Sequence, residues 1–202
     1  MTVGLGSGRA VWAVTHRLAP GTPVVVASEL THERALAAGL DIRELDGTFE
    51  LDLAIDGADE IDPSLGLIKG GGGALLREKI VVSAARRFVV VAEASKKVSR
   101  LGEGFRLPVE VVRFGWADTR RRLSSLLPDA ALRTAENESD PYVTDEGHFI
   151  LDCAIPAGTD PRSLAATLAP VPGVVEHGLF LDIAGLALLG WPDGTVERLE
   201  RG

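Results

Sequence analysis

The sequence predicts an α/β protein, with a Rossmann-like, doubly wound and mainly parallel sheet into which a ferredoxin-like α+β subdomain is inserted. Two observations lead to this prediction. Over the first hundred residues, short β-branched runs alternate with helical segments, which is typical of parallel strands joined by crossover helices. From about Phe105 to His177 the expected order changes to β-α-β-β-α-β, the order of a ferredoxin-like unit. We therefore expect one domain made of residues 1–104 and 178–202, and a second made of residues 105–177.

The expected elements of the first domain follow the rhythm of a doubly wound sheet. A strand end at Val3–Leu5 leads into GSG, and Val11, Val14 and Leu18 then recur at the spacing of one helical stripe. The further elements are a buried strand at Pro23–Ser28, a helix over ERALAAG that ends at Gly39, a strand at Leu51–Ile55, a helix from about Ala74 to Arg86 and a buried strand at Arg87–Glu93.

The second domain and the tail contain shorter elements. These are a strand at Leu107–Val112, a helix at Ala117–Leu127, a strand in ALRTA, a hairpin over PYVTDEGHFILDCAI, a helix begun by Asp160 and Pro161, and a strand over VVEHGLFL. The hairpin is expected to turn at Asp145–His148, where Gly147 supplies the unusual backbone angle. The tail LALLGWPDGTVERL predicts two short strands, which we expect to return to the first domain.

Composition limits the class of protein. The 202 residues are 46% hydrophobic and 25% charged, which is ordinary for a folded soluble chain, and no apolar run is long enough to cross a bilayer. The start MTVGLGSG lacks the layout of a secretion signal, and the single Cys153 favours a reducing compartment, so we expect a cytoplasmic protein. The net charge of −8 argues against nucleic-acid binding, and we expect Arg120–Arg122 to be the solvated face of a helix.

Four loops lie at the carboxyl ends of expected strands, where open α/β sheets bind their ligands. They are GLGSGRA (Gly4–Ala10), DGADE (Asp56–Glu60), KGGGG (Lys69–Gly73) and EASKK (Glu93–Lys97). The first opens a helix, so its backbone N–H groups, the Ser7 hydroxyl and the Arg9 charge could hold a phosphate, although a tight turn explains the glycines equally well. NAD binding is not favoured, because a third glycine is missing and Glu29 is the only candidate acid.

The acidic segment DGADEID follows a strand directly. A solvated turn is the plainer interpretation, and a metal site is a third, but no histidine lies nearby in the sequence and the four histidines, which are scattered, are assigned no role. A strand that is apolar on both faces and ends in Asp-Gly directs its acids into the ligand crevice. Catalysis by acids of this segment, which are Asp56, Asp59, Glu60 and Asp62, is therefore favoured over a surface turn.

The four glycines Gly70–Gly73 raise the sharpest question, because glycine costs more backbone entropy than any other residue. They allow a ligand to approach the backbone closely, and Glu78, one turn into the next helix, leans back over them while Lys69 stands on the other side. An exposed charged patch at Arg77–Lys79 is the alternative, but it leaves the glycines unexplained. A carboxylate and a cation that face each other suit proton abstraction beside a carbonyl.

Together, GLGSG, DGADEID, KGGGGALLREK and EASKK resemble the ribose-5-phosphate isomerase A family, over nearly the whole chain and including PGVVEHGLF. The combination of DGADEI with KGGG and REK is the specific part. The resemblance implies an isomerisation of D-ribose 5-phosphate to D-ribulose 5-phosphate through an enediol, in the non-oxidative branch of the pentose phosphate pathway. It implies no metal or organic cofactor and a homodimer or homotetramer.

The resemblance also implies roles for individual residues. Glu78 would carry the proton between C1 and C2, Asp56 and Asp59 would act on ring opening and the sugar hydroxyls, and Lys69 would stabilise the oxyanion. The implied substrate-binding residues are Ser7, Gly8, Arg9, Ala10, Gly57, Ala58, Gly70, Gly71, Gly72 and Lys96, with Lys96 and the loop Ser7–Ala10 at the phosphate.

Two departures from the family pattern concern the first loop. The family continues with Gly-Ser-Thr where this chain has Gly8-Arg9-Ala10, so two hydroxyls are missing and Arg9 is the candidate replacement. The family also has a helix before this loop, whereas this sequence starts almost on the strand. Two alternatives stay open: a sugar-phosphate sensor of related fold, which predicts a helix-turn-helix and a weakened base, and a coenzyme A transferase, for which the chain is short.

Overall fold

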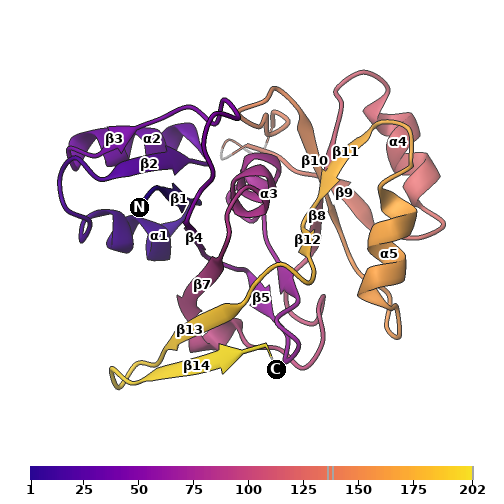
Figure 1. Cartoon of the computed structure of the whole chain (residues 1–202). Helices are drawn as coiled ribbons and strands as arrows, with labels where there is room; N and C mark the ends of the chain where they lie inside the picture. Colours follow the sequence, from indigo (N-terminus) through magenta and orange to yellow (C-terminus); the bar gives the residue numbers. More distant parts are fainter. Residues whose placement is uncertain (136, 138, 202) are drawn as a thin grey trace.

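The computed structural model of the chain describes residues 1–135, 137 and 139–201 (Figure 1). Its largest layer is a seven-stranded sheet of order β14-β13-β7-β4-β1-β2-β3, in which every neighbouring pair is parallel except β13 and β14. Its strands are β1 (Val3–Leu5), β2 (Pro23–Val26), β3 (Asp41–Ile42), β4 (Leu53–Asp56), β7 (Phe88–Glu93), β13 (Leu186–Gly190) and β14 (Val196–Glu200). The predicted doubly wound, mainly parallel sheet is confirmed, as is the return of the tail to it.

Helices cover both faces of this sheet. They are α1 (Arg9–Thr15), α2 (Glu29–Ala37) and α3 (Leu75–Ser83). Because successive side chains of a strand point to opposite faces, Val24 packs in the cluster that contains residues of α1 and α2, whereas Val25 packs with Val81 of α3. The side chain of Ser28 caps α2 by accepting a hydrogen bond from Thr31 N, which explains where that helix begins.

A second, four-stranded sheet lies on the other side of α3. Its elements are β8 (Leu107–Val111), α4 (Trp116–Leu123), β9 (Ala130–Leu132), β10 (Phe149–Cys153), α5 (Pro161–Leu168) and β11 (Val174–His177). The antiparallel order β11-β8-β10-β9 confirms the predicted ferredoxin-like unit, while the exact domain boundaries stay a prediction. Figure 1 shows α3 between the two sheets, where it contacts β1 and β4 on one side and β8 and β11 on the other.

A third, three-stranded sheet corrects two predictions. It consists of β5 (Glu60–Ile61), β6 (Leu67–Ile68) and β12 (Leu179–Phe180), all antiparallel. The glycine loop therefore follows β6 and not a strand of the parallel sheet. The segment VVEHGLFL is not one strand, because at Gly178 the chain passes from the second sheet to the third: Gly178 N donates to Pro108 O at 2.8 Å, and Gly178 O accepts from Lys69 N at 2.9 Å. The close approach of Lys69 O leaves no room for a Cβ there.

The hairpin predicted before β10 is confirmed at its turn, Asp145–His148 with Gly147 at a positive φ, but its strand pairing is wrong. Both edges of β10 are already occupied, by β8 and by β9, so the preceding segment cannot pair with it. In the turn, Thr144 N donates to His148 O at 3.0 Å and Gly147 has a φ of 77°.

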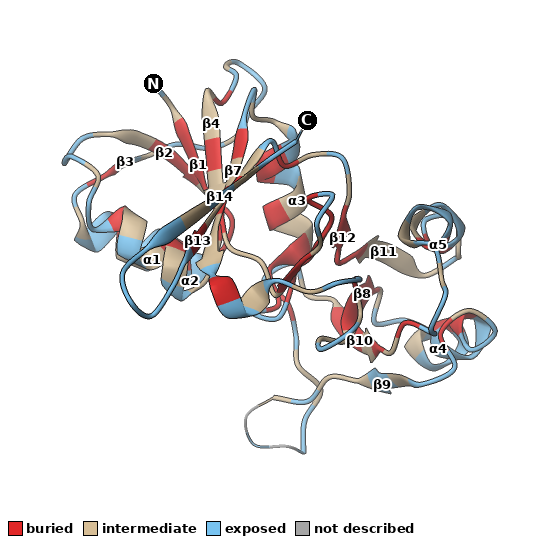
Figure 2. Ribbon diagram, turned by 90° about the horizontal axis from the view of Figure 1, so that it is seen from below, coloured by how far each residue is buried: buried red, intermediate tan, exposed pale blue. Residues whose placement is uncertain are grey.

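Exposure follows the layers (Figure 2): the strands are mostly buried, and α4 and α5 turn exposed sides outward. Arg120–Arg122 are exposed, as predicted, and Arg121 and Arg122 pair with Asp118 in the same helix. Among the described residues, no helix has the length and apolar character that a membrane crossing requires.

Candidate active site

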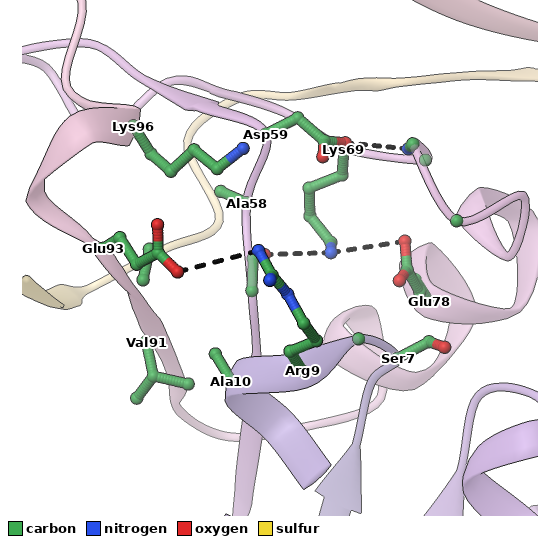
Figure 3. Close-up of a pocket in the computed structure, with 16 residues that line it drawn as sticks. Ser7, Arg9, Ala10, Ala58, Asp59, Lys69, Glu78, Val91, Glu93 and Lys96 are labelled. Carbon is green, nitrogen blue, oxygen red and sulfur yellow. Dashed lines mark hydrogen bonds and ion pairs between the residues drawn. The ribbon is translucent and has the colours of Figure 1, made fainter. Parts of the chain in front are cut away.

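An open pocket lies where the loops after β1, β4 and β7 meet the glycine loop. Its cavity volume is about 180 Å³. Its lining residues are Ser7, Gly8, Arg9, Ala10, Gly57, Ala58, Asp59, Lys69, Gly70, Gly71, Gly72, Glu78, Val91, Ala92, Glu93 and Lys96 (Figure 3). The structure thus brings every sequence-predicted site residue to one pocket, except Asp56, which lies behind it. Sequence reasoning missed Val91 and Ala92, although their place at the carboxyl end of β7 was a usable signal.

The pocket wall contains a buried group of two carboxyls and one ammonium. Lys69 Nζ lies 2.8 Å from Asp56 Oδ2 and 3.2 Å from Glu78 Oε2, and it donates a hydrogen bond to Gly57 O at 2.9 Å. Lys69 is 2% exposed and Glu78 is 4% exposed. The alternative of a charged surface patch at residues 77–79 is therefore wrong for Glu78, which points from the first turn of α3 toward Lys69.

The two carboxyls of this group differ in their hydrogen bonds. Asp56 Oδ1 accepts from Gly57 N at 2.7 Å and from Ser7 N at 3.2 Å, so three donors surround Asp56 when Lys69 is counted. The cation near Glu78 is Lys69, and its Nζ lies farther from Glu78, at 3.2 Å, than from Asp56, at 2.8 Å. Burial raises the pKa of both carboxyls. Because one ammonium balances only one carboxylate, Asp56, which has more hydrogen-bond donors, holds the negative charge, and Glu78 is the group that takes a proton.

The pKa values follow from this arrangement. Burial, and then the charge of Asp56, raise the pKa of Glu78 to about 8, against the opposing effect of Lys69. For Lys69, burial is the largest influence and lowers the pKa, but Asp56 and Glu78 together outweigh it, so the pKa lies above its ordinary value. The site therefore keeps a charged lysine beside a glutamate that titrates near neutral pH, which is the range that general base catalysis requires.

The structure explains three of the four glycines in the loop. Gly70 and Gly73 have positive φ angles of 103° and 85°, which favour glycine. A Cβ on Gly71 would lie 2.7 Å from Asp59 Oδ1, and Gly71 N donates to Asp59 Oδ2 at 2.8 Å. A Cβ on Gly72 would meet open space, so the fold itself does not require glycine at this pocket-lining position.

The opposite side of the pocket is more exposed. Gly8 begins α1 with a φ of 112°, and Arg9, whose side chain is 87% exposed, reaches toward Glu93, with Arg9 Nη2 3.7 Å from Glu93 Oε1. Figure 3 shows Lys96 extending over the pocket in the direction of Asp59. A cation on each side of an open mouth suits an anionic group such as a phosphate.

Other residues support the site from outside. The ring of Phe180, on β12, lies 5.5 Å from Lys69 Nζ and 4.7 Å from Lys79 Nζ. Arg133 and Tyr142, from the segment between β9 and β10, bind carbonyl groups of the glycine loop. Sequence reasoning assigned no role to these three residues, although Phe180 ends the segment PGVVEHGLF, because each reaches the site from a distant segment. Among the residues that the structure describes, no cluster of three or more His, Cys, Asp or Glu side chains could hold a metal ion.

Comparisons with known proteins agree with this geometry. The family model of ribose 5-phosphate isomerase A (phosphoriboisomerase A) matches residues 23–194. The chain is 51% identical to ribose-5-phosphate isomerase A of Roseiflexus sp. (strain RS-1), over 98% of this chain and 88% of that protein. It is 48% identical to the protein of the same name from Synechococcus sp. (strain JA-3-3Ab), over 100% of this chain and 90% of that protein.

Two solved structures resemble the fold over the whole chain. One is a D-ribose-5-phosphate isomerase in complex with phospho-erythronic acid, with a TM-score of 0.92, 35% identity and coverage of 100% of this chain and 91% of that one. The other is the ribose 5-phosphate isomerase A of Methanocaldococcus jannaschii, with a TM-score of 0.90, 34% identity and coverage of 99% and 91%.

Proposed function

This chain belongs to the ribose 5-phosphate isomerase A family, and we propose that it interconverts D-ribose 5-phosphate and D-ribulose 5-phosphate by a proton transfer at Glu78. The observation that carries this proposal is the buried group of Asp56, Lys69 and Glu78 beside an open pocket. It supplies a carboxyl whose pKa is raised to about 8 and an ammonium 3.2 Å from it. An isomerisation through an enediol needs such a base together with a group that stabilises the oxyanion.

The proton transfer proceeds once the sugar is in its open-chain form. The Glu78 carboxylate takes the proton from C2 of the aldose, the electron pair of that C–H bond forms the C1–C2 double bond, and negative charge develops on the aldehyde oxygen. A proton then moves from the C2 hydroxyl to the C1 oxygen, and Glu78 returns its proton to C1, which yields the ketose. Lys69 and the N–H groups of Gly70 and Gly72 are the donors that we assign to the oxyanion, since Gly71 N–H is bound to Asp59.

The two aspartates are assigned different tasks. Asp59 lines the pocket, and Gly71 N fixes one of its oxygens, so it is placed to take the proton of the anomeric hydroxyl when the ring opens. Asp56 has no exposed surface and does not line the pocket. Direct contact of Asp56 with the sugar hydroxyls stays a prediction. Its burial favours a role through Lys69, whose charge and position it holds.

We assign the phosphate to the exposed side of the pocket, between Lys96, Arg9 and the backbone of the loop Ser7–Ala10. Arg9 there takes the place of the two hydroxyls that the family pattern has and this chain lacks. Its pairing with Glu93 at 3.7 Å is loose enough for a phosphate to displace the carboxylate, because an exposed pair contributes about 0–1 kcal/mol.

We also propose that the chain acts in the cytoplasm, within the non-oxidative branch of the pentose phosphate pathway, and as a homodimer or homotetramer. Burial raises the pKa of the Cys153 thiol to about 12, so this single cysteine is kept unreactive, as suits a reducing compartment. Leu36 on α2 and Ile80 on α3 are exposed apolar side chains that favour association with another subunit. Size-exclusion chromatography with light scattering measures the number of subunits.

The test of the catalytic proposal compares the native chain with Glu78→Gln. Native protein should convert ribose 5-phosphate to ribulose 5-phosphate and exchange the transferred hydrogen with D₂O, and the variant should lose about 10³-fold in kcat. Unchanged turnover in the variant would remove Glu78 from the mechanism. Native protein that binds ribose 5-phosphate without converting it would favour the sensor, and acyl transfer from coenzyme A thioesters would favour the transferase.

A further inference from the structure

Two side chains from the segment between β9 and β10 bind successive carbonyl groups of the glycine loop. Arg133 Nη1 donates to Gly70 O at 2.9 Å and to Gly71 O at 3.1 Å. Tyr142 OH donates to Gly72 O at 3.2 Å. Neither residue lines the pocket, and both lie about 60 to 70 positions along the chain from the loop that they hold.

These contacts act together with a hydrogen bond inside the loop, from Gly73 N to Gly70 O at 3.0 Å, to determine where its amide groups point. In a trans peptide unit the C=O and the following N–H point in opposite directions. With its carbonyl on Arg133, the Gly70 peptide directs Gly71 N–H away from the arginine, toward Asp59 Oδ2 at 2.8 Å. The next peptide, held by the same guanidinium, directs Gly72 N–H away from Arg133 as well. Among the described residues this N–H has no partner, and Gly72 lines the pocket.

The guanidinium of Arg133 is itself firmly held. Its Nε and Nη2 atoms donate to the two carboxylate oxygens of Asp152, at 2.8 and 2.5 Å, and its side chain is only 14% exposed. Asp152 lies on β10 and Arg133 directly follows β9, and these two strands pair with each other. The arginine fork therefore joins a rigid sheet to the two carbonyls, which the single point charge of a lysine cannot reproduce.

We propose that Arg133 is a positioning residue for the isomerisation: it fixes the glycine loop so that the Gly72 N–H is directed at the developing oxyanion. This inference rests on the proposed function, since it assigns the free amide to the oxygen of the enediolate. Arg133 touches no substrate. It acts through the peptide planes of Gly70 and Gly71, with Asp152 holding it and Tyr142 adding one further contact.

The test compares Arg133→Met with the matched control Arg106→Met. Arg106 also binds β10, through Asp152 O at 2.9 Å, and it pairs with Asp129, but it has no contact with the glycine loop. Arg133→Met should lower kcat about 10- to 100-fold with little change in KM, because a misdirected amide weakens the transition state and not the ground state. Arg133→Lys should recover only a small part of the kcat that Arg133→Met loses. Tyr142→Phe should lower kcat a few-fold, and Arg106→Met should leave kcat within about twofold of the native value.

Two further measurements separate positioning from a loss of structure. Phospho-erythronic acid has a planar carboxylate where the enediolate has its oxygens, so Arg133→Met should weaken its binding by about the factor lost in kcat/KM. Amide hydrogen exchange at Gly71–Ala74 should accelerate in Arg133→Met and not in Arg106→Met. Equal falls in kcat for both arginine variants, or unchanged exchange at the loop, would overturn the inference. A native chain without isomerase activity would overturn the proposed function instead, while the exchange measurement would still decide whether Arg133 holds the loop.

Discussion

The two ends of the pocket are built in different ways. At one end, Asp56, Lys69 and Glu78 are buried, and each charged group lies within 3.2 Å of another. At the other end, Arg9 is exposed and meets Glu93 only at 3.7 Å, and Lys96 is half-buried. In the function that we propose, the folded core therefore fixes the groups assigned to proton transfer, whereas the groups assigned to the phosphate are long side chains that the fold does not fix.

The largest effect should come from Lys69→Met, which removes the only cation of the buried group. Two acidic groups would then share a site without a counter-charge, and breaking a buried ion pair typically costs about 3–5 kcal/mol. We expect kcat to fall below detection and the midpoint of urea unfolding to drop strongly. Equilibrium unfolding at pH 7, together with an assay at saturating ribose 5-phosphate, measures both effects.

The matched control for this variant is the triple change Asp56→Asn, Lys69→Met and Glu78→Gln, which neutralises the whole group. If uncompensated charge causes the instability, the triple variant should regain most of the lost stability while staying inactive. A triple variant that is no more stable than Lys69→Met would show that the packing of the lysine stem, and not its charge, matters at this end.

The second prediction concerns pH and uses the raised pKa of Glu78. Because the base form is needed to take the C2 proton, kcat/KM for the native chain should rise with pH and level off above about 8. A Glu78→Asp variant should keep this shape at a lower rate, because it keeps a carboxyl in the same buried group. A native profile that is flat between pH 6 and 9 would contradict a base with this pKa.

The same pKa predicts the pH dependence of stability. A carboxyl whose folded pKa of about 8 lies above its ordinary value of 4.5 holds its proton more tightly in the folded chain. Its contribution to stability is therefore complete below pH 4.5 and is lost as the pH rises through about 8. Glu78→Gln, which stays neutral, should lose less stability than the native chain between pH 6 and 9. Thermal unfolding of both proteins across this range gives the comparison.

The buried end of the pocket was predictable from sequence because Glu78 and Asp56 are positioned by the local structure around them. A helix that starts after a glycine loop leans its first-turn side chains back over that loop, so the position of Glu78 followed from spacing alone. Asp56 was found because it ends a buried strand. What spacing could not give was the burial of Lys69, since this depends on Asp56 and on Phe180, which arrives from more than a hundred residues away.

Sequence patterns missed the shortest strands and the contacts between residues that are far apart in the sequence. The strands β5, β6 and β12 have two residues each, too few to show any periodicity, and Gly178 joins two sheets within one apolar run. Arg133 carried no signal either, because its role depends on carbonyls of Gly70 and Gly71 that only the folded chain brings near. Contacts set by backbone geometry, and not by side-chain type, leave no pattern along the sequence.

The third prediction moves to the exposed end of the pocket. Lys96→Ala should raise KM for ribose 5-phosphate about tenfold, the effect of losing one charge-assisted contact, and should leave the melting temperature unchanged. The loss should shrink as salt is added, because salt screens an exposed charge in the native chain. Lys97→Ala is the matched control, because Lys97 is next to Lys96 but pairs with Glu197 at 2.6 Å and does not line the pocket. Equal KM values for the two variants would remove Lys96 from the phosphate site.

The smallest effect is expected at Arg9, and it bears most directly on the difference between the two ends. Arg9→Ala should raise KM about two- to fivefold, because Glu93 already competes for the guanidinium and because solvent screens it. The double variant Arg9→Ser and Ala10→Thr restores the hydroxyls of the family pattern, and it should regain the native KM if Arg9 replaces them. Glu93→Gln should lower KM, since it frees Arg9 for the phosphate. If Arg9→Ala leaves KM unchanged while the double variant lowers it below the native value, Arg9 points outward and the loop backbone holds the phosphate alone.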